Sequence, residues 1–252
     1  MVERRIARAA ERFWSRSGGR PTPPADMERA VLWALPLDVQ PITGLTVAHI
    51  AAWLSARGLP HPPLGPARRL RGCLLARRGQ GMVFVAADDP PAEQRFTLAH
   101  EAAHFLLDYQ EKRERALARL GEAIRPVLDG ERPPTHQERL QALLADVPLG
   151  LHTHLMERGP DGAPCLEAAS AECDADRLAL ELLAPEREAL ALVRATGTDR
   201  ETYAAQAARA AAALAARFGL PPAVAEGYAR GLLHRLTGGP SVAEWLGLGA
   251  RR

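Results

Sequence analysis

The chain has 252 residues, which is enough for one sizeable core with a smaller appendage. Hydrophobic residues make up 47% and charged residues 25%, a balance that excludes a disordered or fibrous chain. The formal net charge of +2 is too small to indicate a nucleic-acid partner by itself. Function therefore has to be inferred from motifs.

The cysteines and the hydropathy pattern bear on the compartment. Cys73, Cys165 and Cys173 are odd in number and lack the paired spacing of a zinc ribbon or a redox motif, which predicts reduced thiols. No stretch reaches the roughly 18 apolar residues that would span a bilayer, and no charged start leads into an apolar signal core. We therefore expect a cytoplasmic protein with no membrane partner.

The first part of the chain is predicted to be mostly helical. Helical character over 2–17 ends in a run of glycines and prolines, and a short helix follows from a cap at Asp26 to Leu35. A third helix is expected over 46–57, with Gly58 as its terminator. Residues 1–41 are expected to form an N-terminal helical arm, and the main domain is expected over 42–185.

Two short apolar runs at 70–76 and 82–87 predict an antiparallel hairpin around a turn at 78–81. Apolar residues then recur at helical spacing from Phe96 to Leu107. Two charged amphipathic helices are expected within 111–145, a loop over 147–164, and a helix over 168–183 that is ended by Pro185. We predict an α+β fold, mainly helical, with a small antiparallel sheet, a helical insertion at about 110–165 and a helical C-terminal cap at 186–252.

Residues 100–104 read His-Glu-Ala-Ala-His. Positions four apart lie on one face of a helix, so His100 and His104 can bind one ion while Glu101 projects beside it. Zinc would lower the pKa of a bound water towards about 7, and Glu101 would take the proton as the hydroxide attacks a carbonyl. These roles belong to metal-assisted hydrolysis.

A catalytic zinc normally takes three protein ligands and leaves one position for water. Glu172 is the predicted third ligand, and Asp176, four residues later, would accept the other N–H of a ligating histidine. Asp174 and Glu167 compete for the ligand role, and the alternative for this helix is a solvated acidic face. Two histidines and a carboxylate also suit manganese or iron, so one Zn²⁺ per chain is a preference.

His152 and His154 would point the same way in an extended segment and could bind a metal. Loop packing is the plainer interpretation, and a substrate-side group that stabilises the oxyanion is the sharper one. Tyr109 is a further candidate for the oxyanion role. The sequence assigns that role to none of the three.

The block from Arg95 to Glu101 and the later block from Glu172 to Pro185 resemble the ImmA/IrrE family of zinc metallopeptidases. The family pattern has the same Arg-Phe-Thr-Leu-Ala lead and a later Glu helix that ends in Leu-Leu-x-Pro. The resemblance covers roughly 42–235, most firmly 82–107 and 170–185, and it implies the same ligands and the same catalytic glutamate. Ala103 departs from the usual glycine and Leu178 from the usual phenylalanine.

The resemblance also implies a biological setting. Such proteins are bacterial and cytosolic, and they often cleave a helix-turn-helix repressor to switch on stress or mobile-element genes. The separation from His104 to Glu172, 172 − 104 = 68 positions, is longer than is common in the family. We expect an insertion of about 40 residues to gate the cleft or select the substrate.

Two functions of other classes compete with the endopeptidase. A zinc-bound regulatory or sensor protein would not cleave, but such a site has no need of Glu101. A DNA-binding regulator would use the helices at 206–236, where Arg230, His234 and Arg235 are sparse for phosphate contacts. The sequence therefore favours an endopeptidase with a protein substrate and no direct nucleic-acid binding.

Overall fold

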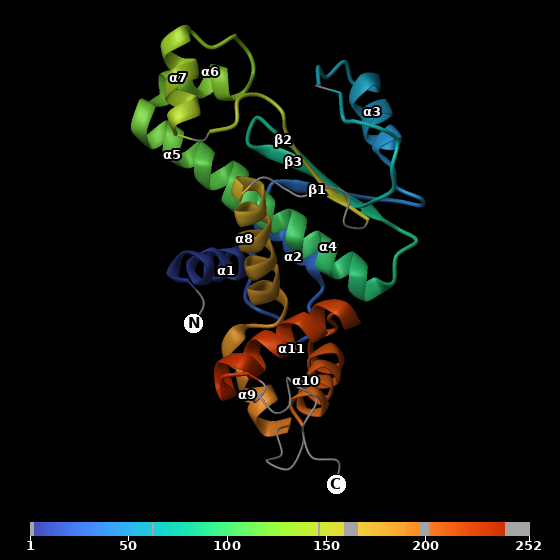
Figure 1. Ribbon diagram of the computed structural model, residues 1–252. Helices are drawn as coiled ribbons and strands as arrows, with labels where there is room; N and C mark the ends of the chain where they lie inside the picture. Colours follow the sequence, from blue (N-terminus) through green and yellow to red (C-terminus); the bar gives the residue numbers. More distant parts are fainter. Residues whose placement is uncertain (1–2, 62, 146, 159–165, 197–201, 240–252) are drawn as a thin grey trace.

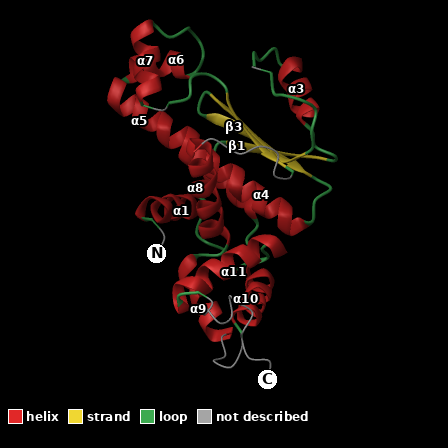
Figure 2. Ribbon diagram, in the orientation of Figure 1, coloured by secondary structure: helices red, strands yellow, loops and turns green. Residues whose placement is uncertain are grey.

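The computed structural model describes residues 3–239 except 62, 146, 159–165 and 197–201. Figures 1 and 2 show a small sheet with α3 on one side and α4 and α8 on the other. The helices α9, α10 and α11 form a group at the C-terminal end. The predicted α+β class, mainly helical with a small sheet and C-terminal helices, is confirmed.

The elements in chain order are α1 (Arg4–Arg16), α2 (Met27–Ala34), β1 (Leu37–Ile42), α3 (Val47–Ala56), β2 (Leu70–Arg77), β3 (Gln80–Ala86), α4 (Pro91–His104), the π-helix η1 (Phe105–Gln110), α5 (Glu111–Leu120), the 3₁₀-helix η2 (Glu122–Ile124), α6 (Arg125–Leu128), α7 (His136–Leu144), β4 (His152–Glu157), α8 (Leu166–Leu183), α9 (Glu186–Thr196), α10 (Tyr203–Phe218) and α11 (Pro222–Thr237).

The strands form one four-stranded sheet in the order β1-β3-β2-β4. The predicted hairpin is β2 and β3, which pair antiparallel. The expectation of a wholly antiparallel sheet was wrong, because β1 pairs parallel to β3. The expectation of a loop over 147–164 was also wrong in part, because β4 pairs antiparallel with β2 inside it.

Alternate residues of the sheet face two different hydrophobic clusters. Cys73 and Phe84 point towards α3 and pack with residues such as Ile50, whereas Leu74 and Val83 belong to the larger cluster that contains α4 and α8. His154 of β4 is the cross-strand partner of Leu74. Partners in a ladder point to the same face, so the fold directs His154 towards α4.

The N-terminal segment shares the core of the larger cluster. Ile6 and Phe13 of α1 are each 1% exposed within it, and several side chains of α2 are buried in it as well. β1 runs across the predicted boundary between residues 41 and 42. α1 and α2 therefore pack into the body that contains α4, and the predicted boundary falls within a strand.

The predicted insertion has a small core of its own. Ala116, Ile124, Val127, Leu128 and Val147 form a third cluster that joins α5, η2 and α6. The insertion begins on a continuous helical path, because α4 runs through η1 into α5. It returns to the sheet through β4, so its far end becomes an edge strand.

Gly72 allows β2 to lie close to α4. A Cβ atom at this position would stand 2.5 Å from Cγ2 of Thr97 and 3.1 Å from Oε1 of Glu101. Only a residue without a side chain fits there, so Gly72 sets the spacing between the sheet and the helix beside Glu101.

We predict that Gly72→Ala destabilises the fold by about 1–3 kcal/mol, because the methyl group overpacks the contact with Thr97. Gly227→Ala is the matched control, since a Cβ there meets nothing within 4 Å and lies in α11. The control should raise stability by about 0.5–1 kcal/mol through the higher helix propensity of alanine. Denaturant unfolding of both variants checks this, and equal midpoints would show that the contact carries no constraint.

Candidate metal centre

The His-Glu-Ala-Ala-His motif lies on the buried part of α4. His100 and His104 are each 2% exposed and Glu101 is fully buried. The spacing of four residues brings the Nε2 atoms of the two histidines to 3.0 Å from each other. The predicted helical placement of the motif is thus what the structure has.

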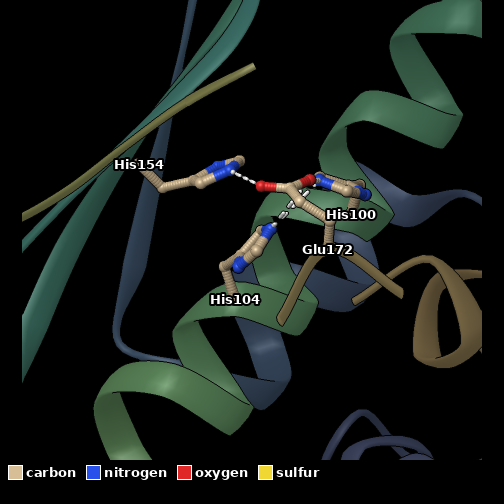
Figure 3. A group of neighbouring side chains, drawn as sticks. All are labelled: His100, His104, His154 and Glu172. Carbon is tan, nitrogen blue, oxygen red and sulfur yellow. Dashed lines mark hydrogen bonds and ion pairs between the residues drawn. The ribbon is translucent and has the colours of Figure 1, made fainter. Parts of the chain in front are cut away.

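Glu172 reaches the two histidines from α8. Its Oε2 atom lies 3.3 Å from Nε2 of His100 and 3.8 Å from Nε2 of His104. Figure 3 shows its carboxylate between the imidazoles. Three residues separated by up to 72 positions therefore converge on one point.

A carboxylate holds the outer nitrogen of each of these imidazoles. Nδ1 of His100 donates to Asp176 at 2.9 Å, the contact that the spacing of Asp176 from Glu172 had predicted. Nδ1 of His104 donates to Asp108 at 2.8 Å, a partner that the sequence analysis missed. Both bonds fix the ring so that Nε2 faces the centre, as in histidines that ligate metals.

His154 completes the cluster from β4. Its Nε2 atom lies 2.8 Å from Oε1 of Glu172, and its Nδ1 donates to Oε2 of Glu101 at 2.9 Å. Its ring stacks on His104 at a centroid distance of 3.6 Å. One ligand atom from each of His100, His104, His154 and Glu172 lies within 4.8 Å of all the others.

Carboxylate neighbours raise the pKa of two of the imidazoles. Burial lowers the pKa of His100, but hydrogen bonds to Asp176 and Glu172 outweigh it and raise the pKa to about 9. Burial likewise opposes the charged form of His154, while Glu101 and Glu172 raise its pKa to about 10. The hydrogen bonds from His100, His104 and His154 hold the pKa of Glu172 far below its usual range.

A divalent cation would bind these imidazoles in their deprotonated form, because a metal ligand needs a free nitrogen lone pair. Donor atoms about 2.0–2.1 Å from a tetrahedral ion lie about 3.3–3.4 Å from one another. The separations of 3.0, 3.3 and 3.8 Å among His100, His104 and Glu172 bracket that value. The residues fit a divalent metal, and this donor set suits zinc, manganese and iron alike.

The other oxyanion candidates lie elsewhere. The Tyr109 hydroxyl accepts a hydrogen bond from the backbone N–H of Gly79 at 2.8 Å, and its ring stacks with His152 at 5.9 Å. Burial lowers the pKa of His152 to about 4. Of the three candidates, the structure brings only His154 into the metal cluster.

Of the two competitors for the third ligand position, Asp174 has other partners. Asp174 forms ion pairs with Arg5 at 3.3 Å and with Arg177 at 3.6 Å. The side chain of Glu167 lies outside the part of the chain whose side chains are described.

A histidine pair on one helical turn, a glutamate beside the first histidine and a second glutamate from another helix are typical of metal-dependent peptidases. Residues 66–126 match the Peptidase_M78 family model, described as the IrrE N-terminal-like domain. This match confirms the resemblance to the ImmA/IrrE family over the segment from β2 to α6, and it ends before Glu172. No curated protein matches the chain.

We predict that Asp176→Ala lowers the affinity for zinc about 10–100-fold, because His100 loses the acceptor that orients its ring. Asp174→Ala is the control on the same helix, since Asp174 pairs with arginines instead. Competition with a chelator measures both affinities. An equal loss in the two variants would mean that the effect comes from the charge of the helix and not from the His100 contact.

Proposed function

We propose that the protein is a zinc-dependent endopeptidase whose metal is held by His100, His104 and Glu172, with Glu101 as the general base. One observation carries the proposal: ligand atoms of two buried imidazoles and of a glutamate from α8 lie within 4.8 Å of one another, and a buried glutamate follows the first of these histidines in the sequence. The match of the α4 region to a peptidase family supports it.

A bound zinc ion supplies the Lewis acid that activates a water molecule and polarises a carbonyl. Glu101 has an open oxygen, which a general base needs. Its Oε1 atom is buried and has no hydrogen-bond partner among the described residues. Glu101 would take a proton from the attacking water there and deliver it to the nitrogen of the leaving amine.

The sheet offers a place for a peptide beside this base. β4 is the last strand of the described sheet and pairs with β2 along one edge only. An extended peptide can add to such an edge through backbone hydrogen bonds. The substrate would then run along the strand that carries His154, which supports a protein substrate cleaved within its chain.

The family resemblance supports the biological part of the proposal. We propose a bacterial, cytoplasmic peptidase that acts on a regulatory protein such as a helix-turn-helix repressor in a stress or mobile-element response. The insertion, with α5, α6 and α7, lies next to the sheet in Figure 1 and is proposed to select that substrate. In the described part of the chain, no helix is both long and apolar enough to cross a membrane.

A non-cleaving metal-bound regulator is the second candidate. Oε2 of Glu101 accepts a hydrogen bond from His154, so this oxygen has a structural role that needs no catalysis.

We do not propose DNA binding through the C-terminal helices. Arg230 pairs with Glu226 and Arg235 pairs with Glu186, so these charges are neutralised within the protein. Phosphate contacts would have to break these pairs.

We predict that Glu101→Gln keeps the fold and the metal but abolishes cleavage, because the amide cannot accept the proton. The measurement compares new protein N-termini in host cells that carry the native protein or the variant, during ordinary growth and after DNA damage. A terminus found only with the native protein would identify the substrate and the cleaved bond.

Glu114→Gln is the matched control, because Glu114 lies on the continuing helix α5 and contacts Gln110 at the surface. It should give the same termini as the native protein. Identical termini in all three samples, with purified protein that still holds one zinc ion, would support the non-cleaving regulator instead.

A further inference from the structure

The three histidines of the cluster share one hydrogen-bonding pattern. Nδ1 of His100 donates to Asp176 at 2.9 Å, Nδ1 of His104 to Asp108 at 2.8 Å, and Nδ1 of His154 to Glu101 at 2.9 Å. A carboxylate on the outer nitrogen is the usual support of a metal-ligating histidine. His154 is therefore prepared in the same way as the two histidines of the motif.

The inner nitrogen of His154 also lies where a ligand belongs. Its Nε2 atom is 2.8 Å from Oε1 of Glu172, and the four candidate ligand atoms are within 4.8 Å of one another. The side chain is 15% exposed, so solvent has little access to this position. A tetrahedral zinc has four positions, and these four residues would fill all of them.

We propose that His154 is a fourth protein ligand and that the described arrangement is a closed, latent form of the metal centre. This proposal rests on the proposed peptidase function. The closed form blocks one requirement of catalysis, because the position needed for water is taken. One oxygen of the proposed base Glu101 also holds the ring of His154, while the other stays open.

Opening requires β4 to carry His154 away from α4. All six residues of β4 are only partly buried, whereas most of β2 and the second half of β3 are buried. Two ion pairs hold the C-terminal end of β4, one between Glu157 and Arg68 and one between Arg158 and Asp89. His152 and His154 lie at the other end, which follows α7 in the chain. A shift of α7 would therefore reach the His154 end of β4 first.

X-ray absorption spectroscopy of the zinc-loaded, full-length native protein tests the proposal without any variant. Three imidazoles around the zinc are expected for the closed form. Two imidazoles with a water-derived oxygen would overturn it, because His154 would then be a neighbour and not a ligand.

A second measurement uses the cobalt-substituted protein and azide, a small anion that binds only at an open position. The visible spectrum of the native protein should stay unchanged at azide concentrations that shift the spectrum of His154→Ala. His152→Ala is the matched control on the same strand and should behave like the native protein. An azide response in the native protein equal to that of His154→Ala would contradict the closed centre.

Both readouts report on the metal and not on cleavage, so the two proposals fail separately. Cleavage that persists in Glu101→Gln removes the proposed mechanism and leaves the count of imidazoles standing. If only two imidazoles bind zinc in the native protein, the proposal of a latent form fails, and the proposed peptidase function is unaffected.

Discussion

The burial of two imidazoles and a carboxylate on one helix is the constraint on which the rest of the site depends. His100, Glu101 and His104 are nearly or fully buried, and polar groups buried without partners cost several kcal/mol. Three other segments supply hydrogen-bond partners for these groups. α8 contributes Glu172 and Asp176, η1 contributes Asp108, and β4 contributes His154. A divalent metal would bind these imidazoles in their deprotonated form.

Small residues around α4 make this convergence possible. Ala99, Ala102 and Ala103 of α4 and Ala175 and Ala179 of α8 are fully buried. Short side chains let the two helices approach closely enough for a carboxylate on α8 to reach a ring on α4. Ala103, at the position where the resembling family usually has glycine, is completely buried. On the sheet side, Gly72 has the same effect.

The parts of the site that sequence predicted are those fixed by spacing along one helix. His100 and His104 follow from a separation of four, and Asp176 follows from Glu172 by the same rule. Asp108 lies four residues after His104 and could have been found in this way, although it falls in the π-helical segment that no local pattern indicated. Glu172 was predicted because a catalytic zinc needs a third ligand, and the family pattern implied the same residue. No local rule relates α8 to α4, so Asp174 and Glu167 stayed open as competitors.

β1 and β4 were missed because their sequences lack local strand signals. Pro36 and Pro41 interrupt the region of β1, so it read as a connection, and its pairing with β3 depends on the fold of the whole sheet. β4 has the sequence His-Thr-His-Leu-Met-Glu, with one β-branched residue, and it lies among glycines and prolines. Its place against β2 is a tertiary effect, and so is the approach of His154 to Glu101.

The position of β4 changes the meaning of the long separation between His104 and Glu172. An insertion that formed only a surface lobe would leave the two motif blocks unaffected. Here the predicted insertion has its own small core and then enters the sheet, where its last strand places an imidazole between the proposed base Glu101 and the carboxylate of Glu172. Any partner that shifts α5 or α7 therefore acts on a segment that is covalently continuous with the metal cluster. The added residues are thus physically linked to the state of the site, which a lobe that merely covers the cleft would not be.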